Sequence, residues 1–597
     1  MILQSLCAYY DQLLETHPDE VSKPGWCPRR VSFMLDLSPQ GELRGVIPSS
    51  DDKGQLRTVP EQVKRSSGVA ANFLCDNSSY FLGIDAKGKP DRSVSCFEAA
   101  RVLHLEVLAD AESDAACAVR GFFEDWNPAD GADILRSVTS ADVVEKVLSG
   151  GDLEFSVRGE RVLDDAEVCS VWERFKLASN EDAKTMSCLV TGERSPIARL
   201  HPAIKGVYGA QSVGASLVGF NAPAFESYGH DGEQGLNAPV GEQAAFAYST
   251  ALNYLLGDSS HHMILGDTTV VYWAERHDDV CTFAVSSLLG GSPVYGERLR
   301  DSDGDIAAIM GRIRSGKPIE GVDLDEPFYV LGLAPNAARL SVRFFHRSTF
   351  GAVLENLAAH YGRLEIAGTG AAGERRYLTP YRLLKEIENP HSSKGSVSPL
   401  LGGAFLRAIL EDVEYPEALF SNAMLRTRAT QDDKDNHIYK VTRGRVAIVR
   451  AYLIKNKKRS EEEVTVSLNE DRTDAPYVLG RLFAILEGIQ QTANPGINAT
   501  IKDRYFNSAC ATPSIAFPTL VKLAGNHLSK IERDRGGLAR FLESEMSELL
   551  GNLDSFPKRL SLEQQGDFLL GYYHQTCKRF EKRQGANNQD EQNEQEA

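Results

Sequence analysis

The chain has 597 residues, which is more than one hydrophobic core can serve, so at least two domains are expected. Its 42% hydrophobic, 8% aromatic and 25% charged residues exclude a disordered or fibrous protein. The net charge of −18 at pH 7 argues against nucleic-acid binding unless basic residues cluster locally.

The hydropathy and the cysteines indicate in which cellular compartment the protein resides. No apolar run approaches the ~18 residues that span a bilayer, and the N-terminus MILQSLCAYYDQLLETH lacks the basic region of a leader. Ten cysteines are scattered without a CxxC pair, which argues against a zinc site and a disulfide framework. We therefore expect a cytoplasmic protein with reduced thiols and no membrane partner.

Residues 1–390 mix strand and helix patterns and predict an α+β body of several sheets. The runs VSFMLDL, TTVVYWAE, PFYVLGLA and LSVRFFH are typical of strands because they are rich in β-branched and aromatic residues. Acidic segments near residues 124 to 168, EDWNPADGAD and VLDDAEV, are expected to be solvated insertions. A Gly/Ser-rich stretch from Asn389 is interpreted as a linker.

One glycine-rich stretch in this body, KGVYGAQSVGASLVGFN at residues 205–221, allows two interpretations. It lacks the terminal Gly-Lys-Ser/Thr of a phosphate loop. Its amides and basic group suit close approach to a duplex, because Asn and Gln can pair with adenine while Lys and Ser contact phosphate or guanine. The alternative is a tight hairpin packed against the core.

Motifs with catalytic potential are incomplete. GRIRSGKP has phosphate-loop spacing, but Pro318 replaces the hydroxyl residue that binds magnesium. GTGAAG at residues 368–373 is followed by Pro380, which interrupts the helix that a dinucleotide site needs. The pairs His261-His262 and His277-Asp278 lack further metal ligands at helical spacing. We expect no enzyme, cofactor or metal; the alternative is a nucleotide-dependent hydrolase or nuclease that uses GRIRSGKP.

The remainder of the chain is predicted to be helical. Residues 391–475 form a basic connecting region, where residues 421–459 hold eleven basic side chains and three acidic ones. Apolar residues from Leu479 to Ile489 repeat with helical period until Asn494-Pro495-Gly496. Residues 476–583 are predicted to form a helical bundle, with Ser561 as the N-cap of its last helix. The polar tail 584–597 is expected to be disordered.

Several stretches together resemble one family, the Csd1-type large subunit of the type I-C CRISPR surveillance complex (Cascade). They occur in the expected order from Met1 to about Phe580, with no recognisable motif between about residues 105 and 190. The stretches are MILQSLCAYYDQLL, KRSSGVAANFLCDNSSYFLG, RLHPAIKGVYGAQSVGASLVGFNAPAFESYG, NAPVGEQAAFAYSTALNYLL, RLSVRFFHRSTFGAVLENLAAHY, YVLGRLFAILEGIQ and RYFNSACATPSIAFPTLVKLAGNHLSKIE.

The resemblance implies a non-catalytic subunit that recognises the protospacer-adjacent motif on target double-stranded DNA and supports R-loop formation. The implied partners are the guide CRISPR RNA, the target DNA, the backbone, repeat-processing and small subunits, and a helicase-nuclease that the complex recruits. The family also implies that the small subunit is made from an internal start, which we expect at Val478 or Leu479. From Val478 the product would have 120 residues.

The resemblance further implies that two loops read the motif, one around Asn72 and one within residues 205–221. Asn72 would face base edges, although a turn or cap role is an open alternative. Arg443, Arg445 and Arg450 are hypothesised to hold the displaced strand or the guide, with a solvated helix face as the alternative. The predicted residues of the two loops are Lys64, Arg65, Asn72, Lys205, Gln211, Ser212 and Asn221.

Overall fold

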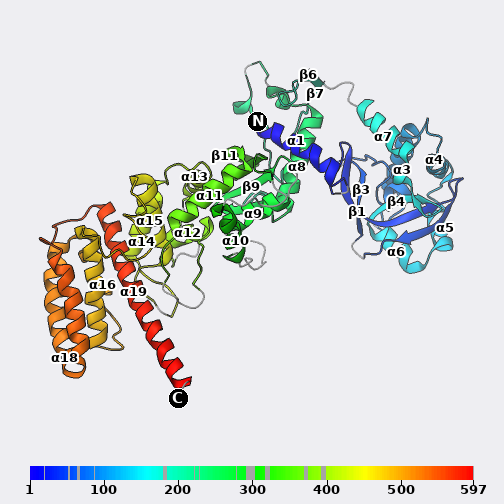
Figure 1. Cartoon of the computed structure of the whole chain (residues 1–597). Helices are drawn as coiled ribbons and strands as arrows, with labels where there is room; N and C mark the ends of the chain where they lie inside the picture. The colour runs from blue at the N-terminus through cyan, green and yellow to red at the C-terminus, as the bar shows by residue number, and fades with distance from the viewer. Residues whose placement is uncertain are drawn as a thin grey trace. The chain divides into compact units, whose positions relative to one another are not determined.

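The structure, a computed structural model, divides the chain into two compact units (Figure 1). Unit 1 comprises Met1–Pro202 and Val218–Tyr254, and unit 2 comprises Ala203–Leu217 and Leu255–Ala597. The predicted α+β class with a helical C-terminal region is confirmed. The described residues are 1–18, 20–51, 54–63, 68–86, 88–178, 184–220, 222–227, 229–230, 232–276, 279–290, 303–315, 323–368, 374–391, 398–433 and 435–595.

Unit 1 contains a mixed sheet with the order β2-β1-β4-β5, in which β3 also pairs with β1. The long strand β1 is antiparallel to β2 and β3 and parallel to β4. Its run VSFMLDL confirms the predicted strand, because buried and partly exposed residues alternate along it. The strands are β1 Trp26–Leu37, β2 Leu43–Pro48, β3 Gln55–Pro60, β4 Asp152–Val157 and β5 Glu160–Arg161.

Six helices and one 3-10 turn cover this sheet and enclose an aromatic core. Phe155 on β4 stacks on Phe81 with ring centroids 4.7 Å apart. Trp126 and Leu163 are also buried, so the expectation that the acidic segments are solvated insertions is wrong: apolar residues of both segments belong to the core. The elements are α2 Ser78–Phe81, α3 Pro90–Val107, α4 Asp114–Asp125, α5 Gly131–Val138, α6 Ala141–Ser149, η1 Val162–Asp164 and α7 Ala166–Ala178.

The rest of unit 1 joins segments far apart in the sequence. The N-terminal helix α1 packs on α8, where Tyr10 meets Phe246 edge to face at 6.1 Å and the Cys7 thiol donates to the Ala244 carbonyl at 3.5 Å. α8 continues past Tyr254 into unit 2. The elements are α1 Ile2–Thr16, β6 Thr185–Ser187, β7 Arg194–Pro196, η2 Pro223–Phe225, η3 Gln234–Asn237 and α8 Glu242–Gly257.

Unit 2 begins with an antiparallel sheet of order β11-β10-β9-β8. The three strand-like runs predicted there are confirmed as β9, β10 and β11. Residues of β9 and β10 share a core with helices on one face of the sheet. The elements are β8 His262–Leu265, β9 Thr268–Ala274, α9 Asp279–Leu289, α10 Asp303–Arg314, β10 Pro327–Asn336, β11 Arg339–Thr349 and α11 Phe350–Leu364.

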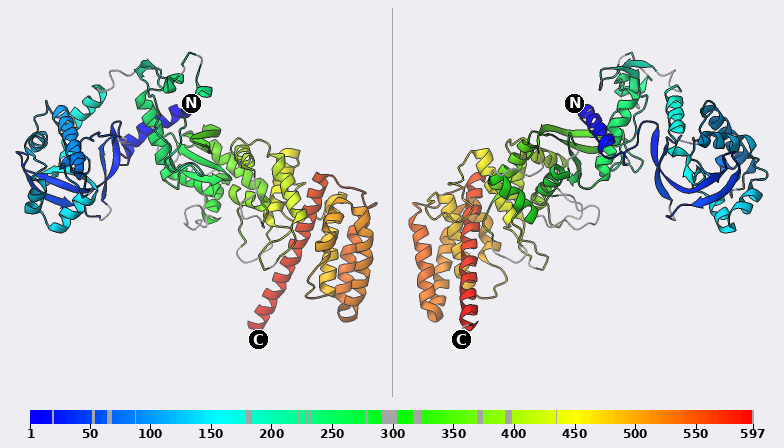
Figure 2. Two further views of the ribbon diagram at one scale, coloured as in Figure 1. Left: turned by 180° about the vertical axis from the view of Figure 1, so that it is seen from behind. Right: turned by 45° about the vertical axis from the view of Figure 1, so that its right-hand side comes forward.

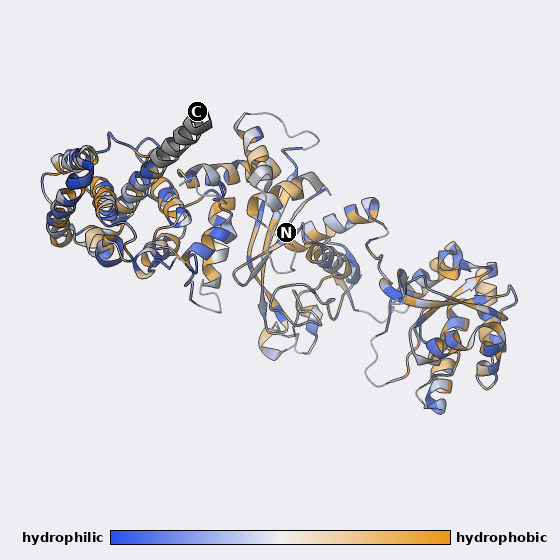
Figure 3. Cartoon of the chain, turned by 90° about the horizontal axis from the view of Figure 1, so that it is seen from below, coloured by the Kyte–Doolittle hydropathy of each residue, from blue (hydrophilic) through white to orange (hydrophobic). Residues whose placement is uncertain are grey.

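The C-terminal helices of unit 2 lie side by side (Figure 2), with hydrophobic and hydrophilic residues alternating around them (Figure 3). One core cluster runs from Met263 to Cys577, so it crosses residues 390 and 475, where domain boundaries were expected. The helices are α12 Pro380–Ile387, α13 Pro399–Leu410, α14 Glu417–Ala429, α15 Arg443–Lys457, α16 Ala475–Ala493, α17 Ile501–Ala511, α18 Pro513–Gly551 and α19 Leu562–Gln595.

The predicted end signals of these helices are mostly confirmed. α16 ends at Ala493, and the Ser561 hydroxyl accepts the Gln564 N–H at 3.2 Å as the predicted N-cap of α19. α19 is drawn through the tail to Gln595, and the expectation of disorder there stays a prediction. Glu and Gln, which are abundant in the tail, are good helix formers. None of the described helices combines the length and apolar composition that a membrane span needs.

Two glycines let α16 and α19 approach closely. A Cβ atom at Gly480 of α16 would overlap the Phe568 carbonyl of α19. A Cβ atom at Gly571 of α19 would overlap the Tyr477 carbonyl of α16. The two helix backbones are therefore in direct contact, and a side chain at either position would separate them.

Candidate nucleic-acid interface

Residues 205–215 of the glycine-rich stretch singled out in the sequence belong to a closed loop in unit 2. Ile204 and Ala215 exchange two backbone hydrogen bonds of 2.9 Å, which join the ends of the loop. Ser216 makes two more backbone bonds, of 3.0 and 2.9 Å, at the turn between β10 and β11. The Tyr208 N–H donates to the Thr269 hydroxyl on β9 at 2.9 Å. The loop is thus fixed to the sheet at Tyr208 and Ser216, in line with the hairpin interpretation.

Three glycines make this closed path possible, since Gly206, Gly209 and Gly214 all have positive φ. At Gly214 a Cβ atom would also come within 2.8 Å of the Ile204 carbonyl oxygen. The backbone conformation of the loop therefore depends on glycine.

The tip of the same loop faces outward. Gln211 and Ser212 are exposed, and so are Tyr208 and Val213, with 48% and 72% of their surface accessible. Lys205 is exposed at the start of the loop, whereas the predicted Asn221 lies outside the described residues. An anchored backbone with amide, hydroxyl and aromatic groups at its tip is chemically able to approach base edges or phosphates. Tyr208 was not singled out from the sequence, although an aromatic residue flanked by glycines is a visible signal.

The second predicted loop belongs to unit 1, and Lys64 and Arg65 lie outside the described residues. Asn72 is only 5% exposed. Its Oδ1 accepts the Val63 N–H at 2.8 Å, and its Nδ2 donates to Gln62 Oε1 at 2.6 Å. The Asn72 amide therefore links the two ends of residues 63–72, which favours the alternative of a turn-holding role over direct contact with bases.

The three arginines of α15 donate mainly to backbone carbonyls. Arg450 is fully buried, and its guanidinium donates to the carbonyls of Val464, Thr465, Gly362 and Arg363 at 2.9 to 3.3 Å. Burial lowers its pKa from the ordinary value. Because Arg450 is buried, its role is to stabilise the fold. Its burial favours neither the predicted phosphate contact nor the alternative of a solvated helix face.

Arg445 and Arg443 have similar surroundings. Arg445 is 5% exposed and donates to the carbonyls of Glu386, Tyr439 and Lys440 at 2.7 to 2.9 Å. Burial lowers its pKa as well. The half-buried Arg443 donates to the carbonyls of Ile366, at 2.9 Å, and Arg375.

Four other basic residues of 421–459 form ion pairs with carboxylates from elsewhere in the chain. These acids lie outside the counted window, so a local count of charges could not include them. The ion pairs are Lys455 with Asp412 at 2.7 Å, Lys457 with Glu563 at 2.5 Å, Lys458 with Glu414 at 3.3 Å and Arg459 with Asp567 at 2.8 Å.

The expected internal start lies inside a helix. Val478 and Leu479 are fully buried in the first turns of α16, whose N-cap is Asp474. Tyr477, one residue earlier, shares a 3.0 Å hydrogen bond with the buried His574 of α19. A chain that began at Val478 would lack the cap and this bond.

The motifs with catalytic potential are only partly described. Lys317 and Pro318, the His277-Asp278 pair and most of GTGAAG lie outside the described residues. His261 and His262 are buried at the start of β8, where the His262 Nδ1 lies 2.8 Å from the Asp258 carbonyl. In the part of the chain that the structure describes, no three His, Cys, Asp or Glu side chains gather as metal ligands.

The fold defines a large α+β protein with an extended helical C-terminal region. The family described as CRISPR-associated protein (Cas_Csd1) matches residues 6–580, which is nearly the whole chain, so the chain belongs to this family. No curated protein matches the chain. The resemblance seen in the sequence is thus confirmed for the family, while its type I-C assignment stays a prediction.

Proposed function

We propose that the chain is the non-catalytic large subunit of a type I-C CRISPR surveillance complex. In this role it binds the guide RNA and the target duplex beside the other subunits, recognises the adjacent motif, supports the R-loop and recruits the helicase-nuclease. Membership of the Csd1 family supports a role in CRISPR defence. The structural observation that carries the DNA-binding part is the anchored loop of residues 204–215 with its exposed tip.

The loop combines two properties that base recognition needs. Its backbone is held by hydrogen bonds to the sheet, so little conformational entropy is lost when a duplex binds. Gln211 offers an amide that can make two hydrogen bonds to adenine in the major groove, and Ser212 can contact phosphate. Asn72 is proposed to contribute indirectly, because its amide bonds to Gln62 and Val63, which directly precede Lys64 and Arg65 in the sequence.

The test measures binding of target duplex by the complex purified with its RNA. We expect Gln211→Ala to weaken the duplex that carries the adjacent motif by about 1 to 3 kcal/mol, because one bidentate base contact is lost. A duplex with a scrambled motif should bind the variant and the wild type alike. Gln4→Ala removes an exposed glutamine on α1 and is the matched control.

Two results would contradict this assignment. Unchanged affinity and motif preference in the Gln211→Ala complex would move motif recognition to another loop. Equal weakening of both duplexes would mean that Gln211 contacts only the phosphate backbone.

A further inference from the structure

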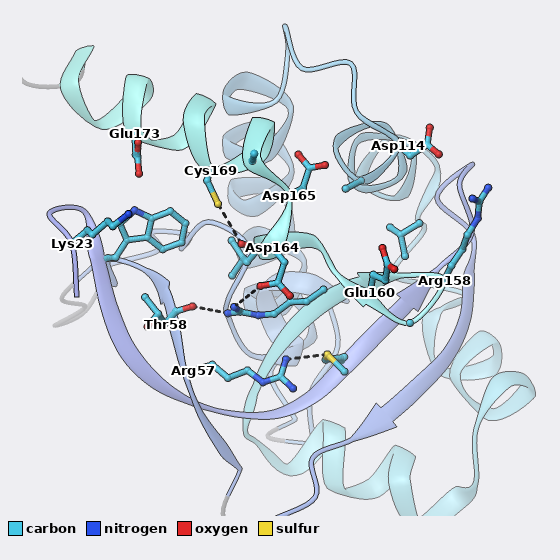
Figure 4. Close-up of a pocket in the computed structure, with 18 of the residues that line it drawn as sticks. Lys23, Arg57, Thr58, Asp114, Arg158, Glu160, Asp164, Asp165, Cys169 and Glu173 are labelled. Carbon is cyan, nitrogen blue, oxygen red and sulfur yellow. Dashed lines mark hydrogen bonds and ion pairs between the residues drawn. The ribbon is translucent and has the colours of Figure 1, made fainter. Parts of the chain in front are cut away.

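Unit 1 contains a groove of about 1360 Å³ beside β3 and α7, and both signs of charge line it (Figure 4). Five carboxylates and four Lys or Arg side chains are among the lining residues. Two of these cations are already paired, since Arg57 and Arg161 lie 3.5 and 2.6 Å from the buried Glu154 carboxylate. The charge of this groove therefore favours neither an anionic nor a cationic ligand.

The turn between β10 and β11 in unit 2 presents an amide that makes no bond within the described chain. Asn336 is the last residue of β10, and Ala337 and Ala338 link it to Arg339, its partner in β11. Ala337 has a φ of 54°, as tight two-residue turns require, so Asn336 stays in the final strand pair. Asn336 is exposed, and its side chain has no hydrogen bond among the described residues. In this it differs from Asn72, whose amide is already bonded to neighbouring residues.

Hydrogen bonds join this turn to the loop of residues 204–215. The Ser216 N–H donates to the Ala338 carbonyl at 3.0 Å, and the Leu340 N–H donates to the Ser216 carbonyl at 2.9 Å. Both bonds are between backbone groups, so they hold the loop and the turn in fixed positions relative to each other.

The tip of the loop reaches the same turn. A Cβ atom at Gly209 would lie 3.3 Å from the Pro335 side chain. Pro335 directly precedes Asn336, and Gly209 lies two residues before Gln211. The exposed Gln211 side chain also has no hydrogen bond among the described residues. Two free amides from separate elements therefore belong to one surface.

The two segments of this surface contain no acidic residue. Residues 204–217 and 333–342 include Lys205 and Arg339 but neither Asp nor Glu, although the whole chain has a net charge of −18. Asp267, in the turn between β8 and β9, is paired with Arg343 at 3.2 Å. A DNA backbone that approaches these segments therefore meets no carboxylate belonging to them, which matters in a protein that is acidic overall.

We propose that Asn336 is a second motif-reading residue, which contacts a base pair next to the one that Gln211 contacts. An amide that pairs through both its oxygen and its nitrogen favours adenine, so both base pairs are A·T. Neighbouring base pairs are spaced by about 3.4 Å along the duplex, so two amides that read them must be held in fixed relative positions. This inference rests on the proposed function, because it adds a residue to the same DNA-binding surface.

The experiment measures binding of target duplexes by the complex purified with its RNA, with each base pair of the adjacent motif replaced in turn. Asn336→Ala removes the amide, whereas Asn336→Asp keeps its shape and an acceptor but not the donor. Gln211→Ala is measured beside them, and Asn526→Ala, at an exposed asparagine of α18, is the matched control. Circular dichroism verifies folding, and Asn336→Asp decides the test if the alanine variant is not folded.

We expect Asn336→Ala to bind the intact motif about 5- to 150-fold more weakly than the wild type. The variant should lose its preference at one base pair where Gln211→Ala keeps it. Asn336→Asp should come to prefer cytosine at that base pair, because a carboxylate accepts from the cytosine amino group. The control should bind every duplex as the wild type does.

Three results would overturn the inference, and they separate it from the proposed function. Wild-type binding by Asn336→Ala with weaker binding by Gln211→Ala would remove Asn336 and leave the proposed function in place. Wild-type binding by both variants would remove the whole surface from motif recognition. Equal weakening of intact and scrambled motifs by Asn336→Ala would mean that Asn336 contacts the phosphate backbone and reads no base.

Discussion

Arg450 and Asn72 illustrate what a single side chain contributes in this protein. Both were singled out from the sequence because guanidinium and amide groups suit nucleic acid. In the structure both are buried and bond to neighbouring segments of the chain: Arg450 to four carbonyls, Asn72 to Val63 and Gln62. Residue type indicated the capacity for hydrogen bonding, but the partner depends on burial, which a single sequence does not specify.

Replacing Arg450 tests this structural role. We expect Arg450→Met to lower the free energy of unfolding by about 3 kcal/mol, because four buried carbonyls lose their donor. Arg428→Met, at an exposed arginine of α14, should have almost no effect and is the control. Urea unfolding followed by circular dichroism measures both. Full stability of Arg450→Met with weaker RNA or DNA binding would restore the phosphate-contact hypothesis.

His104 makes the stability of unit 1 depend on pH. Its Nε2 accepts the Leu74 N–H at 2.9 Å, so Nδ1 carries the proton and donates to the Ala100 carbonyl at 2.7 Å. Burial lowers the pKa of His104 to about 4 from an ordinary value of 6.5. Below pH 6.5 the unfolded chain therefore binds a proton that the folded chain resists, until the pH falls to about 4.

We expect unit 1 to lose about 2 kcal/mol of stability through His104 between pH 7 and pH 5. Hydrogen exchange of peptides from residues 73–107, at both pH values, measures the loss after correction for intrinsic exchange. His104→Gln should be less stable at pH 7 but should lose less between the two pH values. The same pH dependence in the variant and the wild type would assign the effect to other groups.

At the scale of elements, patterns in the sequence predicted individual strands and helices well. The runs in β1, β9, β10 and β11 were recognisable because β-branched and aromatic residues are concentrated there, and α16 was recognisable from its period. The acidic segments near α4 and η1 were expected to be solvated because they contain many carboxylates. That expectation overlooked Trp126 and Leu163, which are buried. Gly480 of α16 and Gly571 of α19 allow the two helices to pack closely, which the sequence alone does not show because it does not pair the helices.

Gly480 tests this helix contact. Gly480→Ala should destabilise unit 2 by about 1 to 3 kcal/mol, since its methyl group would overlap the α19 backbone. Gly525→Ala is the matched control, because open space surrounds this glycine in α18. The control should be neutral or stabilising by up to about 1 kcal/mol, as alanine favours a helix. Equal thermal midpoints for both variants would contradict the close contact.

For the whole molecule, the sequence supported the family and the α+β class but not the division into units. The boundaries between the two units, after Pro202, Leu217 and Tyr254, coincide with no change in composition. The core of unit 2 also extends across the boundaries that were expected at 390 and 475. Within the predicted interface, the glycines made the loop at residues 205–221 recognisable. Its tip is exposed, so contact between this loop and the DNA duplex stays a prediction. Four of the eleven basic residues within 421–459 pair with acids that lie outside this segment in the sequence.

The internal start is a prediction about the products of the gene. When the native coding sequence is expressed with its neighbouring genes, we expect a C-terminal companion of about 120 residues that begins at Val478 or Leu479. Intact-mass analysis of the purified complex measures it. Silent recoding of those two codons is the control, and should remove the companion without changing the long chain. A complex without a companion from the native sequence would refute the internal start.

The contact through Gly480 and Gly571 also has a consequence for synthesis on the ribosome. α16 packs against both α18 and α19, and α19 emerges last. Until then the face of α16 that α19 covers stays exposed near the exit tunnel, and the C-terminal part of unit 2 cannot complete its core. Both helices lie within the last 123 residues, from Ala475 onward. We therefore expect the long chain and a separately translated C-terminal product to finish folding by the same step, the docking of α19 onto α16.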